Sequence, residues 1–396
     1  MRKQTEDAPR KVGFGTHVCV DLKPLLPKLT DVSQLLVPNS LTQVGPLGIS
    51  LGGLVKGGVT ASKLGLPAVI CCPVGNDPLG RLTRDLIAQA NPALADGVFT
   101  CRRGRADSSY SVVVEPGDDR NFWHRPGAND IVRVSDIPFE RLADVCWMHL
   151  GYLNLMRQMW LDAGREMVKL LRRLKKMDII TSLDLTALDP ESEAGKQNWR
   201  AILGNVLPHV DVFMPSFGDL KTFGFLRDGV VEHRLRSLSV IGENLLALGA
   251  AIAVIKLGKN GIYIRVTSDQ KRLQVFSNFP QIQAAAGREF IVPAYRVKAV
   301  ATTGAGDRAN AALISYLVIG EEIEKAARAG AACGAHSVSQ LDPAKADPDR
   351  KTLERIIKRG DLVTTESLDA KRLRDAGFIW DSSRKLWRTL RDSHLG

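Results

Sequence analysis

Runs of apolar residues alternate with amphipathic stretches along most of this chain. Buried-strand patterns such as ADVCWMHLG (143–151), DIITSLDLT (178–186) and VDVFMPS (210–216) follow segments with helical spacing. Repeated strand–helix units predict an α/β domain, in which a doubly wound, mainly parallel sheet is covered by helices on both faces. VGFGTHVCVDL (12–22) predicts one further strand, and AAIAVIKLGKNGIYIRV (250–266) predicts two strands joined by a turn.

Shorter segments do not fit this layer. SSYSVVVEP (108–116) and RNFWHR (120–125) alternate like the strands of an antiparallel hairpin, with GDD (117–119) as its turn. Together with residues 20–50, this hairpin predicts a small β-sheet at one edge of the domain, in the position of a lid.

The character of the chain changes after residue 345. Residues 12–345 are predicted to form one domain with lid pieces near 20–50 and 108–125, and residues 350–396 a small basic C-terminal extension. The extension contains Trp380 and Trp387. It is either a helix and hairpin covering the main domain, which we favour, or a module whose basic and aromatic side chains stack on nucleic acid.

Composition places the chain among soluble globular proteins. Of its 396 residues 44% are hydrophobic and 24% charged, without an apolar run of about 18 residues or an apolar leader. We therefore expect a cytoplasmic protein that does not bind membranes. The six cysteines include no C-x-x-C pair and are expected to be buried thiols. The net charge of +11 permits attraction to anions but does not choose among them.

The stretch AVATTGAGDRANAALISYL (299–317) carries the strongest chemical signal. A helix N-terminus has unpaired N–H groups and partial positive charge. Gly304 and Gly306, on either side of Ala305, would let an anion approach these groups closely. Asp307 repels a phosphate there, but it can accept the proton of an attacking hydroxyl. The pattern suggests phosphoryl transfer, although a plain helix cap is an alternative from these residues alone.

ATTGAGDRANA resembles the C-terminal signature of the ribokinase-like, or PfkB-type, carbohydrate kinase family. Other stretches resemble further family motifs in the same order, and the resemblance covers roughly residues 12–342. These stretches are GFGTHVCVDL (13–22), GGLVKGGVTASKLGLPAVICCPVGNDPLGRLTRDLI (52–87), the hairpin through GAND (108–130), VDVFMPSFGDL (210–220) and IKLGKNGIYI (255–264).

The resemblance implies an enzyme that transfers the γ-phosphoryl group of ATP, with Mg²⁺, to a hydroxyl of a small sugar or nucleoside. It implies that Asp307 is the general base and that residues 304–306 form the anion hole. The implied substrate contacts are Asp21, Gly52 and Gly53; the implied nucleotide contacts are Lys256, Gly258, Gly261 and Thr303; Asp219 is the implied metal residue. Arg125 and Asn129, after the lid hairpin, are candidate substrate contacts or parts of an ordinary turn. Because an open sheet edge often pairs between protomers, a homodimer formed through the lid is a further hypothesis.

Several positions depart from the family pattern. The asparagine that follows the Gly-Gly pair is missing, because Gly57 stands there, with Lys56 beside it. Lys56 either meets an anionic substrate group or points to solvent. Ser216 and Asp219 replace Asn-x-x-Glu, so metal organisation is open.

Two departures flank the GAGD sequence. Ala301 replaces a common aspartate, so we do not expect activation by potassium. Arg308 replaces a small residue and either binds a phosphate, crowds the site or is solvated. These departures leave a second hypothesis, a kinase-fold protein that binds a sugar or nucleotide with little or no turnover. The intact GAGD favours an active kinase.

Overall fold

The computed structural model describes residues 10–26, 37–101, 106–114, 121–225, 237–362 and 368–392. The predicted GDD turn at 117–119 lies outside the described residues. So do residues 27–36 of the first lid piece and residues 363–367 and 393–396 of the C-terminal extension.

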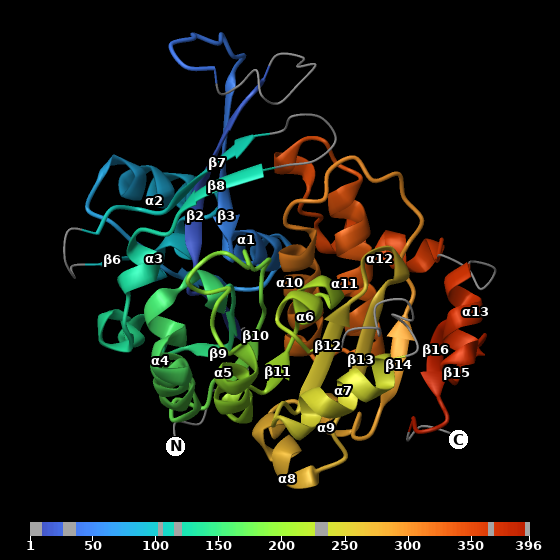
Figure 1. Cartoon of the computed structure of the whole chain (residues 1–396). Helices are drawn as coiled ribbons and strands as arrows, with labels where there is room; N and C mark the ends of the chain where they lie inside the picture. Colours follow the sequence, from blue (N-terminus) through green and yellow to red (C-terminus); the bar gives the residue numbers. More distant parts are fainter. Residues whose placement is uncertain are drawn as a thin grey trace.

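A large sheet forms the centre of the molecule, with strand order β15-β16-β14-β13-β12-β11-β10-β9-β1-β4 (Figure 1). Its strands are β1 (Lys11–Gly15), β4 (Ala68–Cys71), β9 (Val145–Leu150), β10 (Ile180–Leu183), β11 (Val212–Phe213), β12 (Ile252–Lys256), β13 (Ile262–Val266), β14 (Glu289–Val292), β15 (Phe378–Asp381) and β16 (Leu386–Thr389). The strands from β4 to β12 in this order pair in parallel, and β13, β14, β16 and β15 continue antiparallel. The predicted α/β class and mainly parallel sheet are confirmed.

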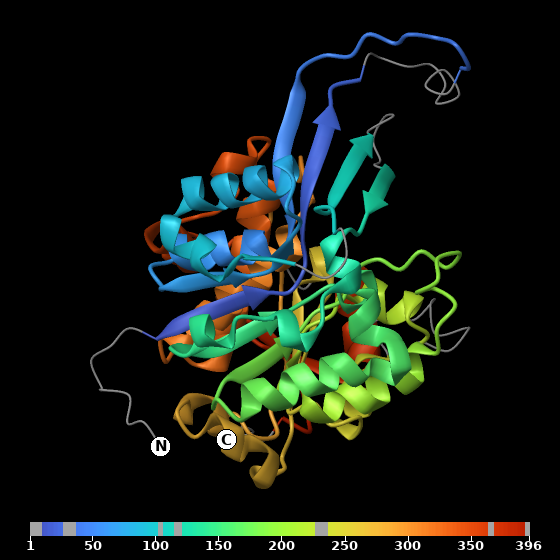
Figure 2. The ribbon, with the colours of Figure 1, turned by 90° about the vertical axis from the view of Figure 1, so that its left-hand side faces the viewer.

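Helices cover both faces of this sheet (Figure 2). Residues of α1, α10, α11 and α12 pack in one apolar core, and residues of α4, α5 and α7 pack in the other. The helices are α1 (Val55–Lys63), α2 (Pro78–Ala90), α3 (Ala128–Ile131), α4 (Arg157–Lys175), α5 (Trp199–Val206), α6 (Phe217–Thr222), α7 (Leu238–Ala247), α8 (Gln270–Leu273), α9 (Pro280–Gln283), α10 (Ala305–Val318), α11 (Ile323–Val338), α12 (Arg350–Arg359) and α13 (Leu368–Asp375).

The predicted small lid sheet is present as a separate sheet, which has four strands in the order β3-β2-β7-β8. Its strands are β2 (Val18–Pro24), β3 (Leu47–Gly53), β7 (Tyr110–Val114) and β8 (Asn121–Arg125). The strand predicted over residues 12–22 is therefore two strands in two sheets. Residues 11–15 pair with β4 and β9, whereas residues 18–24 pair with β3 and β7, so the chain passes from core to lid at Thr16 and His17.

The chain leaves the main sheet again after residue 71. After β4 the chain forms β5 (Pro73–Val74), which pairs with β6 (Phe99–Thr100) in a small two-stranded sheet. Helix α2 then begins at Pro78, with Asp77 as its N-cap accepting a hydrogen bond from the N–H of Gly80 at 2.7 Å.

The C-terminal extension joins the main sheet. Strand β16 pairs with β14, and the buried Phe378 ring meets Tyr263 edge-on, with ring centroids 6.4 Å apart. Arg288 pairs with the buried Asp392 at 2.5 Å. Trp387 is buried, with its ring centroid 5.3 Å from that of Trp380. These contacts favour the covering helix and hairpin over a nucleic-acid module, while the domain boundary itself stays a prediction.

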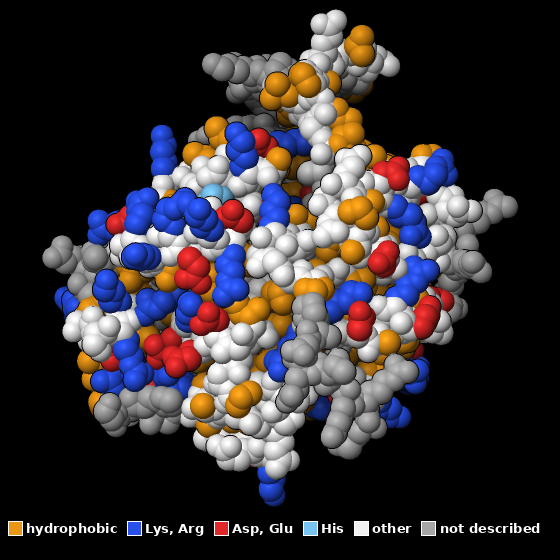
Figure 3. All heavy atoms as spheres, turned by 180° about the vertical axis from the view of Figure 1, so that it is seen from behind, with side chains coloured by type: hydrophobic (Ala, Val, Ile, Leu, Met, Phe, Trp, Pro, Cys, Tyr) orange, Lys and Arg blue, Asp and Glu red, His pale blue; other side chains and the backbone are white. Residues whose placement is uncertain are grey.

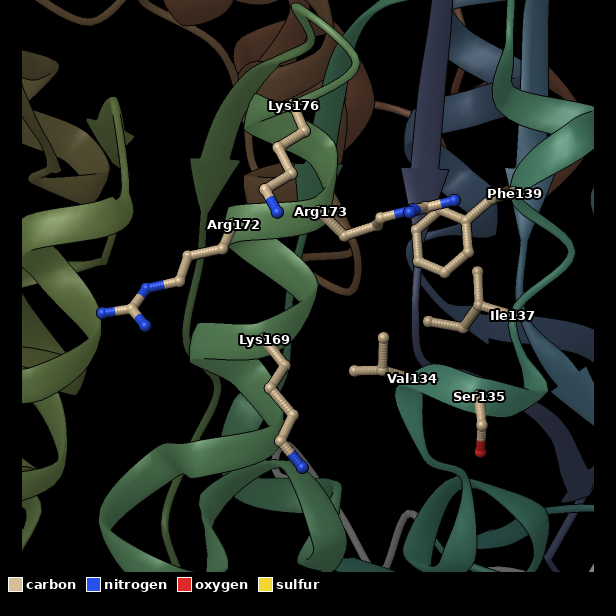
Figure 4. Close-up of a pocket in the computed structure, with 8 residues that line it drawn as sticks. All are labelled: Val134, Ser135, Ile137, Phe139, Lys169, Arg172, Arg173 and Lys176. Atoms are coloured by element: carbon tan, nitrogen blue, oxygen red, sulfur yellow. The ribbon is translucent and has the colours of Figure 1, made fainter.

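Helix α4 carries the basic run at residues 170–177 (Figure 4). Leu170, Leu171 and Leu174 are buried while Arg172 and Arg173 are exposed, so this helix is amphipathic and its basic side chains lie on the solvated face. The basic side chains border an open cavity of about 460 Å³ beside residues 134–139. This cavity lies near Lys176, shortly before the start of β10.

All six cysteines are buried thiols outside any disulfide, as predicted. Across the described ranges, no helix is both long enough and apolar enough to cross a membrane.

Candidate active site

The carboxyl ends of the parallel strands meet at one edge of the main sheet. His17 follows β1, Tyr152 follows β9, Asp184 follows β10, Ser216 follows β11, and Lys256 ends β12. Ligands of open α/β sheets bind at this edge, because loops of different strands converge there.

The GAGD sequence forms the N-terminus of α10 at the same edge. Gly304 is its N-cap with a φ of +74°, and a Cβ at this position would lie 2.4 Å from Cδ of Lys56. A Cβ on Gly306 would lie 3.4 Å from Cε of Lys256. The first N–H groups of an α-helix lack intrahelical partners and carry positive partial charge. This end of α10 therefore fits a phosphate group between two lysine side chains.

Asp307 is buried in the first turn of α10. The Tyr152 hydroxyl lies 3.0 Å from both of its carboxylate oxygens and donates to them. Burial raises the pKa of Asp307, while the charge of Lys56 and the Tyr152 hydrogen bond act in the opposite direction. A carboxylate whose pKa lies nearer the working pH is a better general base.

Lys56 faces this site and not the solvent. Gly57 points to the core, where a Cβ would lie 2.8 Å from the Phe14 ring, so α1 turns the neighbouring Lys56 toward Gly304. The ammonium of Lys56 lies 3.9 Å from Asp21, and only 14% of its side chain is exposed. Of the two alternatives for Lys56, a solvated side chain is wrong.

Asp21, Gly52 and Gly53 come together where the lid meets the core. A Cβ on Gly52 would lie 2.8 Å from Oδ1 of Asp21, and one on Gly53 would lie 2.6 Å from the carbonyl oxygen of His17. Gly53 has a φ of +79°. Glycine is required here by both space and conformation, which leaves the Asp21 carboxylate open to this edge.

The predicted nucleotide residues lie at the end of β12, in the turn that follows it and just before α10. Gly258 and Gly261, with φ of +60° and +99°, flank the tight turn between β12 and β13. A Cβ on Gly261 would lie 1.9 Å from the Val292 carbonyl oxygen, so this turn can pack only with glycine. Thr303 is exposed, and its carbonyl accepts a hydrogen bond from Arg308.

Lys256 takes part in a buried network that the sequence did not indicate. Its ammonium donates to Asp184 at 2.6 Å and to the Met214 carbonyl. Asn310 donates to the same Asp184 oxygen at 2.7 Å. Burial raises the pKa of Asp184 to about 7, and the negative charges of Asp219 and Asp307 add to the increase, whereas Lys256 opposes it.

Asp219 and Ser216 form the capping box of α6. The Ser216 N–H donates to Oδ2 of Asp219 at 2.7 Å, and the Asp219 N–H donates to the Ser216 hydroxyl at 3.1 Å. Within the described ranges, no group of three or more His, Cys, Asp and Glu side chains is arranged to hold a metal. A magnesium ion here would depend on phosphate oxygens and water, as Mg²⁺ commonly does.

Arg308 does not point to solvent, so that expectation is wrong, while a contact between Arg308 and a bound phosphate stays a prediction. It is buried and forms a two-point ion pair with Asp347, at 2.7 and 3.3 Å. Thr60 donates to the same carboxylate at 2.6 Å. This arrangement ties α10 to α1 and to the segment after α11, and it holds the GAGD backbone in place.

Arg125 and Asn129 interact elsewhere in the lid base. Arg125 pairs with Asp107 at 2.9 and 3.1 Å, and 56% of its side chain is exposed. The buried amide of Asn129 donates to the Val18 carbonyl at 2.8 Å and accepts from the Val18 N–H at 3.4 Å. Their role in substrate binding stays a prediction, since both side chains have structural partners.

Sequence reasoning missed Tyr152 as well as Asp184. Each stands within two residues of the carboxyl end of a correctly predicted strand. That position was the available signal, because this edge of the sheet gathers functional side chains.

The doubly wound sheet and its four-stranded lid define the ribokinase fold. The crystal structure of ribokinase from Thermotoga maritima aligns with a TM-score of 0.63 at 20% identity, over 89% of this chain and 100% of that one. Fructokinase from Xylella fastidiosa with bound ATP aligns with a TM-score of 0.66 at 17% identity, over 89% of this chain and 99% of that one.

The family follows from the sequence comparison. The model of the pfkB family of carbohydrate kinases matches residues 58–350, and the chain belongs to this family. An uncharacterized sugar kinase from Archaeoglobus fulgidus is 25% identical over 273 residues, which cover 68% of this chain and 90% of that protein.

Proposed function

We propose that this protein transfers the γ-phosphoryl group of ATP to a hydroxyl of a small sugar or nucleoside, with Asp307 as the general base. The observation that carries the proposal is the buried Asp307 carboxylate beside the glycine-capped N-terminus of α10. Ribokinase from Arabidopsis thaliana was solved with ribose and ATP, and an Escherichia coli protein described as ribokinase II was solved with ATP and Mg²⁺. Both share this fold, which supports the same nucleotide here.

In this proposal the site residues have separate roles in substrate binding, proton transfer and charge stabilisation. Asp21, Gly52 and Gly53 orient the substrate, and Asp307 accepts the proton of the attacking hydroxyl. The N–H groups of residues 304–307, with the Lys56 ammonium beside them, stabilise charge on the transferring phosphoryl group. Gly258, Gly261 and Thr303 would line the nucleotide. Lys256 would pack against Gly306, since a Cβ on Gly306 would lie 3.4 Å from its Cε.

Mg²⁺ would neutralise charge on the transferred phosphoryl group. Asp219 is the residue that we assign to the ion through water, since one of its oxygens already accepts the Ser216 N–H. A cytoplasmic location stays an expectation from the sequence.

Phosphorylation of a panel of neutral sugars, sugar acids and nucleosides, with Asp307→Asn alongside, tests this function. Loss of a general base lowers kcat by about 10²- to 10⁴-fold. Full turnover in the variant would contradict the mechanism.

A binding protein without turnover is the second candidate. The use of Asp219 in a helix cap favours it, because that carboxylate is not fully free for metal organisation. This candidate predicts that sugars raise the unfolding temperature while no substrate on the panel is phosphorylated.

A further inference from the structure

Two histidines lie together where the lid meets the candidate active site. His17 joins core strand β1 to lid strand β2, and His124 lies on lid strand β8, with ring centroids 5.6 Å apart. On its other side the His17 ring lies 5.3 Å from the ring of Tyr152, whose hydroxyl holds Asp307. The three rings connect the lid to the proposed base.

The nitrogen atoms of His17 are buried without partners. His17 is 1% exposed, and neither Nδ1 nor Nε2 has a hydrogen-bond partner among the described residues. Nδ1 of His124 lies 3.0 Å from the Ser111 hydroxyl, but Nε2 is buried and has no partner in the same ranges. Burying a polar atom without a hydrogen-bond partner is unfavourable. A phenylalanine at position 17 would keep the ring contacts without burying unpaired nitrogen atoms. Packing therefore does not explain histidine at position 17.

These nitrogen atoms adjoin the proposed substrate contacts. A Cβ on Gly53 would lie 2.8 Å from Nδ1 of His17. The Asp21 charge acts on His124, and Cys19 donates to Asp21 at 3.3 Å. The histidines and the carboxylate thus belong to one buried region beneath the lid.

The charge state of this region indicates the kind of group that it can bind. Burial lowers the pKa of His17 to about 3 and also lowers that of His124, so both rings are neutral near pH 7. A neutral imidazole offers one donor and one acceptor, as a hydroxyl does, whereas a carboxylate or phosphate only accepts. Two cations of this region already have carboxylate partners, since Lys56 lies beside Asp21 and Arg125 pairs with Asp107.

We propose that His17 and His124 determine specificity by hydrogen-bonding hydroxyl groups of an uncharged sugar or nucleoside held at Asp21. The inference rests on the proposed kinase function and narrows its substrate to a neutral polyhydroxylated molecule. Sugar acids and sugar phosphates are disfavoured, because the cations near Asp21 already have partners: Lys56 lies beside Asp21, and Arg125 pairs with Asp107.

The first test needs no substrate. His17→Phe keeps the ring and removes both nitrogens, so the substrate-free variant is expected to unfold at the same or a higher temperature than wild type. His149→Phe is the matched control, because His149 is equally buried but its Nδ1 lies 2.8 Å from the Ser182 hydroxyl. The control should unfold at a lower temperature. A clear fall in the unfolding temperature of His17→Phe would overturn the inference.

The second test uses D-ribose, D-fructose, D-glucose and adenosine with their monodeoxy analogues. The wild type should lose about 10- to 100-fold in kcat/KM with one or two of the deoxy analogues. His17→Phe and His124→Phe should each lose about as much with the parent substrate, mainly through KM, and nothing further with the matching deoxy analogue. Unchanged selectivity in both variants, or a wild-type preference for sugar acids, would overturn the inference.

Failure of the proposed function can be recognised separately. If the wild type phosphorylates none of these compounds, the kinase proposal fails. The shift in unfolding temperature with the same sugars then tests whether His17 takes part in sugar binding. A shift in the wild type that is lost in His17→Phe supports the inference. Equal shifts in both proteins, or none in either, overturn it.

Discussion

The hydroxyl of Tyr152 lies 3.0 Å from both carboxylate oxygens of Asp307, across 155 positions of sequence. Tyr152 has a left-handed backbone conformation with a φ of +62°, just after the end of β9. A hydrogen bond to the charged form of a carboxyl lowers its pKa and fixes its orientation. Tyr152 is thus a positioning residue for the proposed base.

Tyr152→Phe should lower kcat by about tenfold, the effect of losing one hydrogen bond to a charged group. Without the bond the pKa of Asp307 rises, and the base is active only when deprotonated. As the pH is lowered, the variant should therefore lose activity earlier than wild type, at a higher pH. The measurement is kcat/KM as a function of pH, with Tyr295→Phe, another buried tyrosine, as the control. An unchanged acid limb would contradict the role of Tyr152.

Lys56→Met tests the charge beside the anion hole. The Lys56 ammonium lowers the pKa of Asp307, so removing it should move the acid limb of kcat/KM to higher pH. It should also lower kcat by about 10²-fold, since a charge facing the transition state is lost. Lys63→Met, on the same helix but exposed, is the control and should leave both quantities unchanged. A defect confined to KM would instead assign Lys56 to substrate binding alone.

The sequence predicted the fold and part of this site. Local sequence patterns predicted the elements with strong periodicity, the start of the GAGD helix and the order of the family motifs. Such patterns are visible in a single sequence without knowledge of the fold. The partners of Asp307, Arg308 and Asp184 stand 39 to 155 positions away in sequence, so only the folded chain brings them together.

The expectation that Arg308 is solvated is wrong because this side chain is buried. Arginine is commonly solvated, and nothing near Arg308 in sequence indicated that Asp347 would meet it in the core. In the same way, VGFGTHVCVDL is one apolar run, and the point where it leaves the main sheet depends on which strands pair with each half.

Arg308→Met should destabilise the protein by about 3–5 kcal/mol, because it leaves Asp347 buried without its ion-pair partner. The double variant Arg308→Met with Asp347→Leu should recover most of this loss, since no charge is then left unpaired. Thermal unfolding of the single and double variants checks both outcomes. Arg359→Met is the control, because its pair with Asp361 is exposed and contributes at most about 1 kcal/mol. Equal losses in the single and double variants would contradict this explanation.

Phe378→Ala tests whether the C-terminal extension is part of the main core. Phe378 is buried against Tyr263, so truncating its ring should lower the free energy of unfolding by about 3–5 kcal/mol. Ile379→Ala is the matched control, because the next side chain of β15 is 47% exposed. If the extension were an independent module, unfolding of the main domain would be the same in both variants.

The lid surface predicts association of two copies of this chain. Leu47 and Ile49 of the outer strand β3, and Phe122 and Trp123 of the outer strand β8, are large apolar side chains with exposures of 45–54%. Figure 3 shows hydrophobic side chains on the projecting part of the molecule, while Lys and Arg side chains are spread over the rest of that face. Exposed apolar groups on outer strands favour pairing with another chain.

We therefore expect a dimer in sedimentation velocity at micromolar concentration. Phe122→Ser with Trp123→Ser should shift the protein toward monomer, because the apolar area that drives association is removed. Val240→Ser, at an exposed position of α7 away from the lid, is the control and should leave the dimer intact. A wild-type protein that sediments as a monomer would contradict the prediction, and a dimer unaffected by the lid substitutions would place the interface elsewhere.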